Sequence, residues 1–467
     1  MRIYNTASKK IEEIKILNPP IATVYTCGPT VYDYAHIGHW FTYIRADLLI
    51  RTLKANNFEP KWVLNITDVG HLTSDADEGE DKLAKKAKKE GKDAWHIAEY
   101  FTKDFIDGMN ALNITKPNFM PKATDHIEEQ IKLIEVLEKN GYTYKISDGI
   151  YFDTSKFKDY DKFAGLDLDE QQAGTRIGYN PDKKNHSDFA LWKFSPELEK
   201  RDMEWDSPWG KGFPGWHIEC SAMSMKYLGE TLDFHTGGID HVPVHHTNEV
   251  AQSYCATGKK LANYWLHTNH VLINDEKLSK SLGNGITLDD VLEQGYSLEA
   301  FRLHVLESHY RSQSKFSWDS LEAAKNRLKD LQALAVLRFQ AQKTVNDSAT
   351  FSLREISLQI IDLLSNDLNT PSVMALLSRI STDLQTVLIE EDMVDHFEAM
   401  IKSIDDLLGF RLFELKDINN EQKSLISNRE NARDNKDFAS ADKIRQQLES
   451  QGIGLRDTSY GSIWYYL

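Results

Sequence analysis

The stretch IATVYTCGPTVYDYAHIGHW, from Ile21 to Trp40, decides how the chain begins to fold. Its first residues, Ile21 to Gly28, are rich in β-branched and aromatic side chains, which favours a strand. The strand stops at a Gly-Pro pair, because proline cannot donate to a β ladder. Two histidines, His36 and His39, follow where a new apolar pattern begins. The stretch therefore predicts a strand, a turn and the start of a helix that carries both histidines.

The residues that follow complete a βαβ unit. From His39 to Asn56 apolar residues recur at helical spacing, and Lys61 to Gly70 has the pattern of a second buried strand. Two strands joined in this way are expected to be parallel, with a right-handed crossover. Much later, Thr231 to Asp240 and Asn263 to Ile273 are predicted strands on either side of a helical stretch. We therefore expect one α/β domain, split in the sequence by a segment from about Thr115 to Pro214.

The sequence becomes helical and poor in glycine after about Phe316. Strongly helical stretches from Ser320 to Phe339, Leu353 to Leu368 and Ser372 to Glu390 predict a helix bundle. The tail is predicted as a basic-faced helix that Gly452 ends, followed by a short aromatic segment.

Composition and charge limit the classes of protein to which the chain can belong. The chain has 467 residues, of which 41% are hydrophobic and 27% charged, as in soluble globular proteins of two to four domains. It shows neither a signal peptide nor an apolar run of about 18 residues, so we expect a cytosolic protein that does not span a membrane. A net charge of −16 argues against indiscriminate nucleic-acid binding. Asp81 to Lys92, DKLAKKAKKEGK, is a local basic patch for RNA or simply a solvated helix face.

The turn after the first strand suits a phosphate-containing ligand. A helix start at the carboxyl end of a parallel strand lets phosphate approach backbone amides. Gly38 leaves room for a purine or ribose, while His36 and His39 can donate to phosphate oxygens.

A second element, EKLSKSLGN from Glu276 to Asn284, carries two lysines around a serine. Lys277 and Lys280 can close on a leaving pyrophosphate and neutralise its charge, although such a string is also common in ordinary surface loops.

These two elements resemble the His-Ile-Gly-His and Lys-Met-Ser-Lys-Ser signatures of class I aminoacyl-tRNA synthetases. Leu278 replaces the usual methionine, a swap of similar-sized apolar side chains that should matter little. A third family element matches at GGID, Gly237 to Asp240. The resemblance implies that Gly238 lies against the adenosine of ATP and that Asp240 bonds the ribose hydroxyls.

Four residues are candidate metal ligands. His245 and Glu249 are four positions apart and therefore share one helical face. Cys27 ends the first strand and Cys220 lies in PGWHIECSAMS, so sequence alone leaves open whether they meet, and each thiol alone suits a core. His246 is a weaker candidate, because it points off that face.

This set resembles the zinc site of the cysteinyl-tRNA synthetase family. The resemblance implies one zinc per chain held by Cys27, Cys220, His245 and Glu249, and Cys255 is expected in the core. Zinc favours thiolate and lowers its pKa, which the hydroxyl of serine cannot match. The insertion of about a hundred residues is too modest for an editing domain, so we expect the metal to supply selectivity.

Further stretches carry the resemblance along nearly the whole chain. The stretches are HLTSDADEGEDK, DFALWK, WDSPWG, SHYRS and KDFASAD. They imply that Thr67 and Trp216 lie near bound cysteine and that Trp464 belongs to a tRNA-contacting tail. Tyr465 stands where the family usually has arginine, and packing of the tail aromatics on the bundle is the alternative to an RNA contact.

The resemblance implies a fold and its divisions. It implies a split Rossmann-type, parallel-sheet catalytic domain with a connective insertion, then a helical bundle and a small α+β anticodon-binding domain. The predicted bounds are residues 1–114 and 215–315 for the catalytic halves, 115–214 for the insertion, 316–408 for the bundle and 409–467 for the last domain.

The implied activity is that of a ligase that joins cysteine to its tRNA. ATP, L-cysteine and cysteine tRNA are the implied partners, Mg²⁺ accompanies ATP, and we expect a cytoplasmic monomer. His36, His39, Lys277 and Lys280 would stabilise charge on the triphosphate.

Three alternatives remain. A ligase that attaches cysteine to an amino sugar would not need the bundle and the KDFASAD tail. A catalytically inactive RNA-binding relative would not need intact signatures. A purely structural zinc predicts that Cys27→Ser unfolds the protein, whereas a substrate site predicts weak cysteine binding in a folded protein.

Overall fold

The computed structural model describes residues 1–70, 81–166, 180–196, 201–273, 276–277, 285–341, 353–384, 391–458 and 461–467, with the side chains of 276, 277, 354 and 392 left out. Its contacts divide the chain into two compact units. The larger unit comprises residues 2–288 and 310–314, and the smaller unit comprises residue 1, 289–309 and 315–467.

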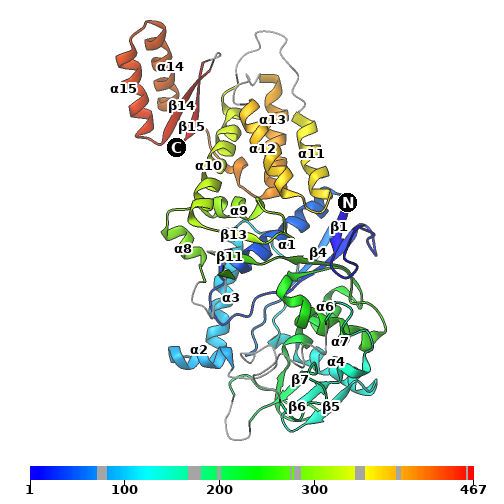
Figure 1. Ribbon diagram of the computed structural model, residues 1–467. Coiled ribbons are helices and arrows are strands. Elements are labelled where there is room, and N and C mark those ends of the chain that lie inside the picture. Colours follow the sequence, from blue (N-terminus) through cyan, green and yellow to red (C-terminus); the bar gives the residue numbers. More distant parts are fainter. Residues whose placement is uncertain are drawn as a thin grey trace. The chain divides into compact units, whose positions relative to one another are not determined.

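A four-stranded parallel sheet forms the centre of the larger unit (Figure 1). Its order is β10 (Ala262–Thr268), β9 (Leu232–Gly238), β3 (Ile21–Thr26) and β4 (Glu59–Leu64). All three pairings are parallel. Two strands precede the 115–214 segment and two follow it, so the expected split of one sheet in the sequence is confirmed.

Helix α1 (Ile37–Ala55) provides the crossover between β3 and β4. Most of its side chains are buried, because the helix is apolar around most of its circumference. Strand β4 ends at Leu64 and does not reach Gly70 as predicted. Beyond Leu64 the Asn65 side chain accepts a hydrogen bond from Gly28 N–H at 2.8 Å, and Thr67 N–H donates to Pro29 at 3.0 Å. These contacts tie the end of β4 to the turn after β3.

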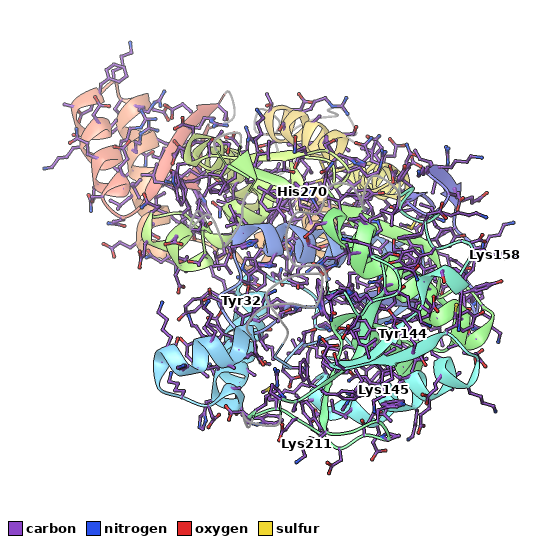
Figure 2. The ribbon with its side chains drawn as sticks, turned by 60° about the horizontal axis from the view of Figure 1, so that its bottom comes forward. Tyr32, Tyr144, Lys145, Lys158, Lys211 and His270 are labelled. Carbon is purple, nitrogen blue, oxygen red and sulfur yellow. The ribbon has the colours of Figure 1, made fainter. Side chains whose placement is uncertain are left out.

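The segment between β4 and β9 contains an antiparallel sheet in the order β5-β6-β7-β8. Its strands are β5 (Thr143–Ile146), β6 (Gly149–Phe152), β7 (Phe189–Phe194) and β8 (Gly212–Pro214). Tyr144 and Lys145 of β5 are labelled in Figure 2. Helix α4 (Ile127–Lys139) and side chains of the later helices share one apolar core with this sheet.

Other elements of the larger unit frame the parallel sheet. Helices α2 (Lys82–Glu90) and α3 (Ala94–Ala111) follow β4, and α6 (Trp216–Leu228) precedes β9. After β9 come the 3-10 turn η3 (Ile239–His241), the π-helical turn η4 (Val242–His246) and α7 (Thr247–Thr257). The short strands are β1 (Arg2–Asn5), β2 (Lys10–Glu13), β11 (Val271–Ile273) and β12 (Glu276–Lys277). The predicted strand from Asn263 to Ile273 is thus two strands, β10 and β11.

Helices dominate the smaller unit. They are α9 (Leu298–Leu306), α10 (Trp318–Ala335), α11 (Leu353–Ser365), α12 (Thr370–Leu384) and α13 (Val394–Leu408), in yellow-green to orange in Figure 1. Along the sequence, the division between the two units falls within helix α8 (Leu288–Glu293) and within strand β13 (Ser314–Phe316). No helix of the described ranges is both long and apolar enough to cross a bilayer.

The sequence predicts a single helix before Gly452 in the C-terminal tail, and the structure has two helices there. The tail forms α14 (Asn420–Asp434) and α15 (Phe438–Glu449), followed by the hairpin β14 (Ile453–Thr458) and β15 (Gly461–Tyr466). Lys436 has a φ of 62°, which a continuous helix does not allow. The Asp437 side chain then accepts from Ser440 N–H at 3.1 Å and caps the second helix.

Candidate active site and metal centre

A cavity of about 550 Å³ opens beside the carboxyl ends of β3, β9 and β10. Crevices at this edge of a parallel sheet are the usual ligand sites of open α/β folds. Seven residues that the sequence predicted for ligand or metal binding line it: Cys27, His36, Gly38, His39, Trp216, Gly238 and Asp240. These residues span more than two hundred positions, and the fold brings them together.

The two signature histidines stack on each other at the start of α1. Their ring centroids are 3.8 Å apart, with 26° between the planes. His36 N–H donates to His39 Nδ1 at 3.1 Å. A nitrogen that accepts carries no proton, so the neutral His39 ring is protonated on Nε2. The first turn of the helix therefore fixes the tautomer in which Nε2 is the donor of His39.

Glycine is required where the chain leaves β3. A Cβ on Gly28 would lie 1.5 Å from the carbonyl oxygen of Asn65. Any larger residue would push the turn away from β4, and with it Cys27 and Pro29, both of which line the cavity. At the end of β9, a Cβ on Gly238 would lie 2.4 Å from a carboxylate oxygen of Asp240.

The four predicted metal ligands form one buried group below this cavity. One donor atom from each of Cys27, Cys220, His245 and Glu249 lies within 4.8 Å of all the others. The ligands come from the end of β3, from α6, from the π-helical turn η4 and from α7. Of the four, Cys27 also lines the cavity, so the group meets the cavity at this residue.

The spacing of the donors fits a tetrahedral metal. The two sulfur atoms of Cys27 and Cys220 are 3.9 Å apart, and His245 Nε2 is 3.8 Å from Glu249 Oε1. Zinc–sulfur bonds of about 2.3 Å in a tetrahedron place two sulfurs about 3.8 Å apart. Both distances are too long for strong hydrogen bonds. The sulfur–sulfur distance matches two ligands of one ion, and the nitrogen–oxygen distance is longer than the about 3.4 Å that shorter zinc–nitrogen and zinc–oxygen bonds would set.

The charge state of the group also indicates a cation. Glu249 is fully buried, and its carboxylate oxygens make no hydrogen bond of good geometry with the described residues, although three histidines lie within 4 Å. Burial raises the pKa of Glu249 well above its usual range, and burial together with neighbouring Cys220 does the same to the pKa of Cys27. A bound cation reverses these shifts, because it stabilises carboxylate and thiolate.

A second set of donors overlaps the first. Cys27, His235, His246 and Glu249 also have donor atoms within 4.8 Å of one another. Here the distances are shorter: 3.3 Å from Cys27 Sγ to His246 Nε2, and 3.0 Å from His235 Nε2 to Glu249 Oε2. Such distances suit hydrogen bonding to a ligand better than shared coordination. His246, which the sequence analysis placed off the ligand face, therefore lies directly against Cys27.

Buried histidines surround the metal group, and the sequence analysis missed most of them. His217 Nδ1 lies 3.0 Å from His245 Nδ1, and His246 Nδ1 lies 2.7 Å from His267 Nε2. Burial lowers the pKa of His246 and His267 well below the usual range, and that of His235 to about 3. The sequence offers one signal for these histidines, which is their local frequency. Seven of the 16 histidines lie between residues 217 and 270.

The two residues predicted near the amino acid differ in position. The Trp216 ring lines the cavity and lies 4.5 Å from the His245 ring, between centroids. Thr67 is buried and is not part of the cavity lining, and its Oγ1 donates to Glu219 Oε2 at 3.1 Å.

The lysine signature lies outside the described residues. Lys280 belongs to the undescribed range 278–284, and of Lys277 only the backbone, in β12, is described. The cavity has lining residues that the sequence analysis did not single out, among them Tyr32, Lys82, His241 and His270 (Tyr32 and His270 are labelled in Figure 2).

Trp464 is buried, with 4% of its surface exposed. Its ring stacks with Phe339 at 6.4 Å, and its backbone N–H donates to Gln340 Oε1 at 2.7 Å. This packing is the alternative that the sequence analysis weighed against an RNA contact. An RNA contact by Trp464 stays a prediction.

Comparison with solved structures supports the fold. Methionyl-tRNA synthetase of Mycobacterium tuberculosis, solved with methionyl-adenylate, superposes with a TM-score of 0.60 at 14% identity, over 84% of this chain and 92% of that one. At this identity the likeness concerns the fold alone. The predicted fold class, an α/β catalytic domain with a parallel sheet of the Rossmann type, is confirmed.

Sequence relatives identify the family. The family model described as the class I (C) tRNA synthetase catalytic domain matches residues 13–326. A cysteine–tRNA ligase of Treponema denticola is 41% identical, over 99% of both chains. Cysteine–tRNA ligase 1 of Burkholderia lata is 43% identical, over 99% of this chain and 96% of its own. The chain belongs to the cysteine–tRNA ligase family of class I tRNA synthetases.

Proposed function

We propose that the protein activates L-cysteine with ATP and transfers it to the terminal adenosine of the cysteine tRNA. The observation that carries this proposal is the buried two-thiol metal group at the floor of the cavity lined by His36 and His39. The cavity accounts for nucleotide chemistry, and the metal group accounts for the choice of amino acid.

Zinc would be held by Cys27, Cys220, His245 and Glu249. When bound, it supplies a soft positive centre that favours a thiolate and lowers its pKa. The contact between His217 Nδ1 and His245 Nδ1 supports this assignment. If His245 binds through Nε2, its Nδ1 proton is donated to His217, and this orients the ring.

Selectivity is the reason that the amino-acid pocket would need a metal. Cysteine and serine are near-isosteres, and an apolar pocket separates such pairs by only about 10–200-fold. A free thiol has a pKa of about 8.5, so it becomes a ligand far more easily than a hydroxyl does. Trp216, whose ring lies against His245, would close the pocket over the side chain, and Thr67 is proposed to lie near the amino acid.

The nucleotide would occupy the rest of the cavity. Gly38 and Gly238 provide surfaces without side chains, and Asp240 would accept hydrogen bonds from ribose hydroxyls. His36 and His39 would donate to the triphosphate as cysteine's carboxylate attacks the α-phosphorus. Pyrophosphate then leaves, and Lys277 and Lys280 would neutralise its charge together with Mg²⁺.

The second step transfers the activated acyl group to a ribose hydroxyl of tRNA, with release of AMP. We propose that residues 316–408 and 409–467 bind tRNA, that 115–214 is a connective insertion between catalytic halves 1–114 and 215–315, and that the protein acts as a cytoplasmic monomer.

Cysteine-dependent exchange of pyrophosphate into ATP tests the proposal. We expect exchange with cysteine, at least about 1,000-fold slower exchange with serine, and charging of cysteine tRNA by the same protein. Equal exchange with serine would contradict metal-based selection, and absence of exchange with either amino acid in zinc-loaded protein would contradict the activity.

A further inference from the structure

We propose that an aromatic and basic face on α2, α3 and the turn before α1 binds the unpaired 3′ end of the tRNA. This inference rests on the proposed function. The α2/α3 face is defined by Tyr34, Lys86, Lys92 and Tyr100, with Tyr32 and Lys82 where it meets the cavity.

Lysines and aromatic rings alternate along the face. Lys82 Nζ lies 5.7 Å from the centre of the Tyr32 ring, and both residues line the active-site cavity. One helical turn further, Lys86 Nζ lies 5.4 Å from the Phe101 ring. At the end of α2, Lys92 Nζ lies 5.7 Å from the Tyr100 ring. The first of these three lysine–aromatic pairs lines the cavity, and the other two follow further along the chain of α2.

The aromatic side chains are exposed in a way that a core would not require. Tyr100 is 51% exposed and Tyr34 is 37% exposed. Their hydroxyl oxygens are 2.8 Å apart, and the Tyr34 ring meets Phe101 edge-on at 5.1 Å. These contacts hold two tyrosine rings in place at the surface. Fixed exposed rings are the platforms on which unpaired bases stack.

The charge of α2 is opposite to that of the whole molecule. Residues 82–92 contain six lysines and one glutamate, whereas the net charge of the chain is −16. Lys86 lies 3.3 Å from Asp33 and 3.5 Å from Glu90, and Lys92 lies 3.2 Å from Glu90. Lys92 is half exposed, so its pair with Glu90 is weak and a phosphate can replace the carboxylate, whereas Lys86 is more enclosed.

An RNA strand fits this arrangement better than a solvated helix face does. A solvated face explains the lysines, but it does not explain why Lys82 and Lys92 each lie over a partly exposed tyrosine ring. The acceptor hydroxyl of tRNA must reach the activated amino acid in the cavity, and the face begins at that cavity. Figure 1 shows α2 and α3 as a helical pair separate from the antiparallel sheet of β5–β7.

The test is a thermodynamic cycle with Tyr100→Ala and a tRNA that lacks its unpaired 3′ nucleotides. Tyr100→Phe keeps the ring, and Tyr254→Ala is a matched control, because Tyr254 lies on α7 and is 46% exposed. We expect Tyr100→Ala to weaken binding of full-length tRNA about ten-fold. Tyr100→Phe and Tyr254→Ala should each change it less than about two-fold.

With truncated tRNA, Tyr100→Ala should bind as the unsubstituted protein does. An equal loss with truncated and full-length tRNA would overturn the inference, because the face would then contact another part of the RNA. Unchanged binding of full-length tRNA would also overturn it. Cysteine-dependent pyrophosphate exchange, which requires no tRNA, is measured on the same samples. Loss of exchange in the unsubstituted protein contradicts the proposed function, and the binding cycle tests the face separately.

Discussion

Cys27 connects the two parts of the candidate site, because it lines the cavity and belongs to the buried group of possible metal ligands. Its position follows from neighbouring sequence. The glycine after it can approach Asn65 closely, and this keeps the end of β3 against β4. A thiol placed in this way can present a metal to the cavity without exposing the other three ligands.

Replacement of this thiol separates a substrate metal from a purely structural one. We expect Cys27→Ser to lose bound zinc and to raise KM for cysteine by at least about 100-fold, because direct ligands matter more than the groups that orient them. The protein should remain folded, since Cys27 and Cys220 belong to one apolar cluster and the other two clusters lie outside the metal group.

Zinc content, circular dichroism and exchange kinetics measure these effects. Cys255→Ser is the matched control, because it changes a buried thiol outside the metal group. It should keep its zinc and its KM for cysteine. An unfolded Cys27→Ser protein beside a folded control would favour the structural metal.

The relative placement of single residues was predictable where a motif carries its own spacing. His36 and His39, or His245 and Glu249, are each set by one helical turn, so sequence predicts that they share a face. The surrounding histidines could not be assigned in this way. His217, His235 and His267 meet the site through tertiary packing between α6, β9 and β10, which no local pattern encodes.

At the scale of elements, the βαβ unit was predictable because apolar periodicity and strand composition agree along it. Errors occurred where side chains override the pattern. The predicted strand to Gly70 ends at Leu64, where side-chain and backbone contacts to the β3 turn replace regular pairing. The predicted single C-terminal helix breaks at Lys436, within an Asp-Asn-Lys-Asp stretch from 434 to 437 whose aspartates and asparagine favour turns and helix caps.

The C-terminal helical pair and hairpin depend on one carboxylate. Asp457 accepts hydrogen bonds from Arg429 at 2.7 and 3.0 Å and also pairs with Arg433. The hydrogen bonds from Arg429 hold the pKa of Asp457 well below its usual range. A depressed pKa stabilises the fold above the unfolded value near 4, and this contribution is lost as pH falls through the folded pKa.

Asp457→Asn should therefore reduce the stability of this region by about 1 kcal/mol at pH 7 and by progressively less below pH 4. Amide hydrogen exchange in β14 and β15 measures the local effect. Asp406→Asn, which removes a pair with exposed Lys402, should change exchange little. A destabilisation that stays constant down to pH 3 would contradict the role given to the charge.

At the scale of the whole molecule, charge and RNA binding must be reconciled. A chain of net charge −16 repels tRNA on average, so attraction depends on local lysines and arginines. We expect tRNA affinity to fall with salt, with a slope of at least about −2 in a plot of log affinity against log salt concentration. A slope near zero in filter-binding or fluorescence titrations would contradict this.

We propose above all that the thiolate of substrate cysteine binds a metal held by Cys27, Cys220, His245 and Glu249. X-ray absorption at the zinc edge tests it most directly, because it counts sulfur neighbours at about 2.3 Å. The zinc-loaded protein should show two sulfur neighbours alone, three with cysteine and two with serine. A count that stays at two when cysteine is bound would contradict the claim.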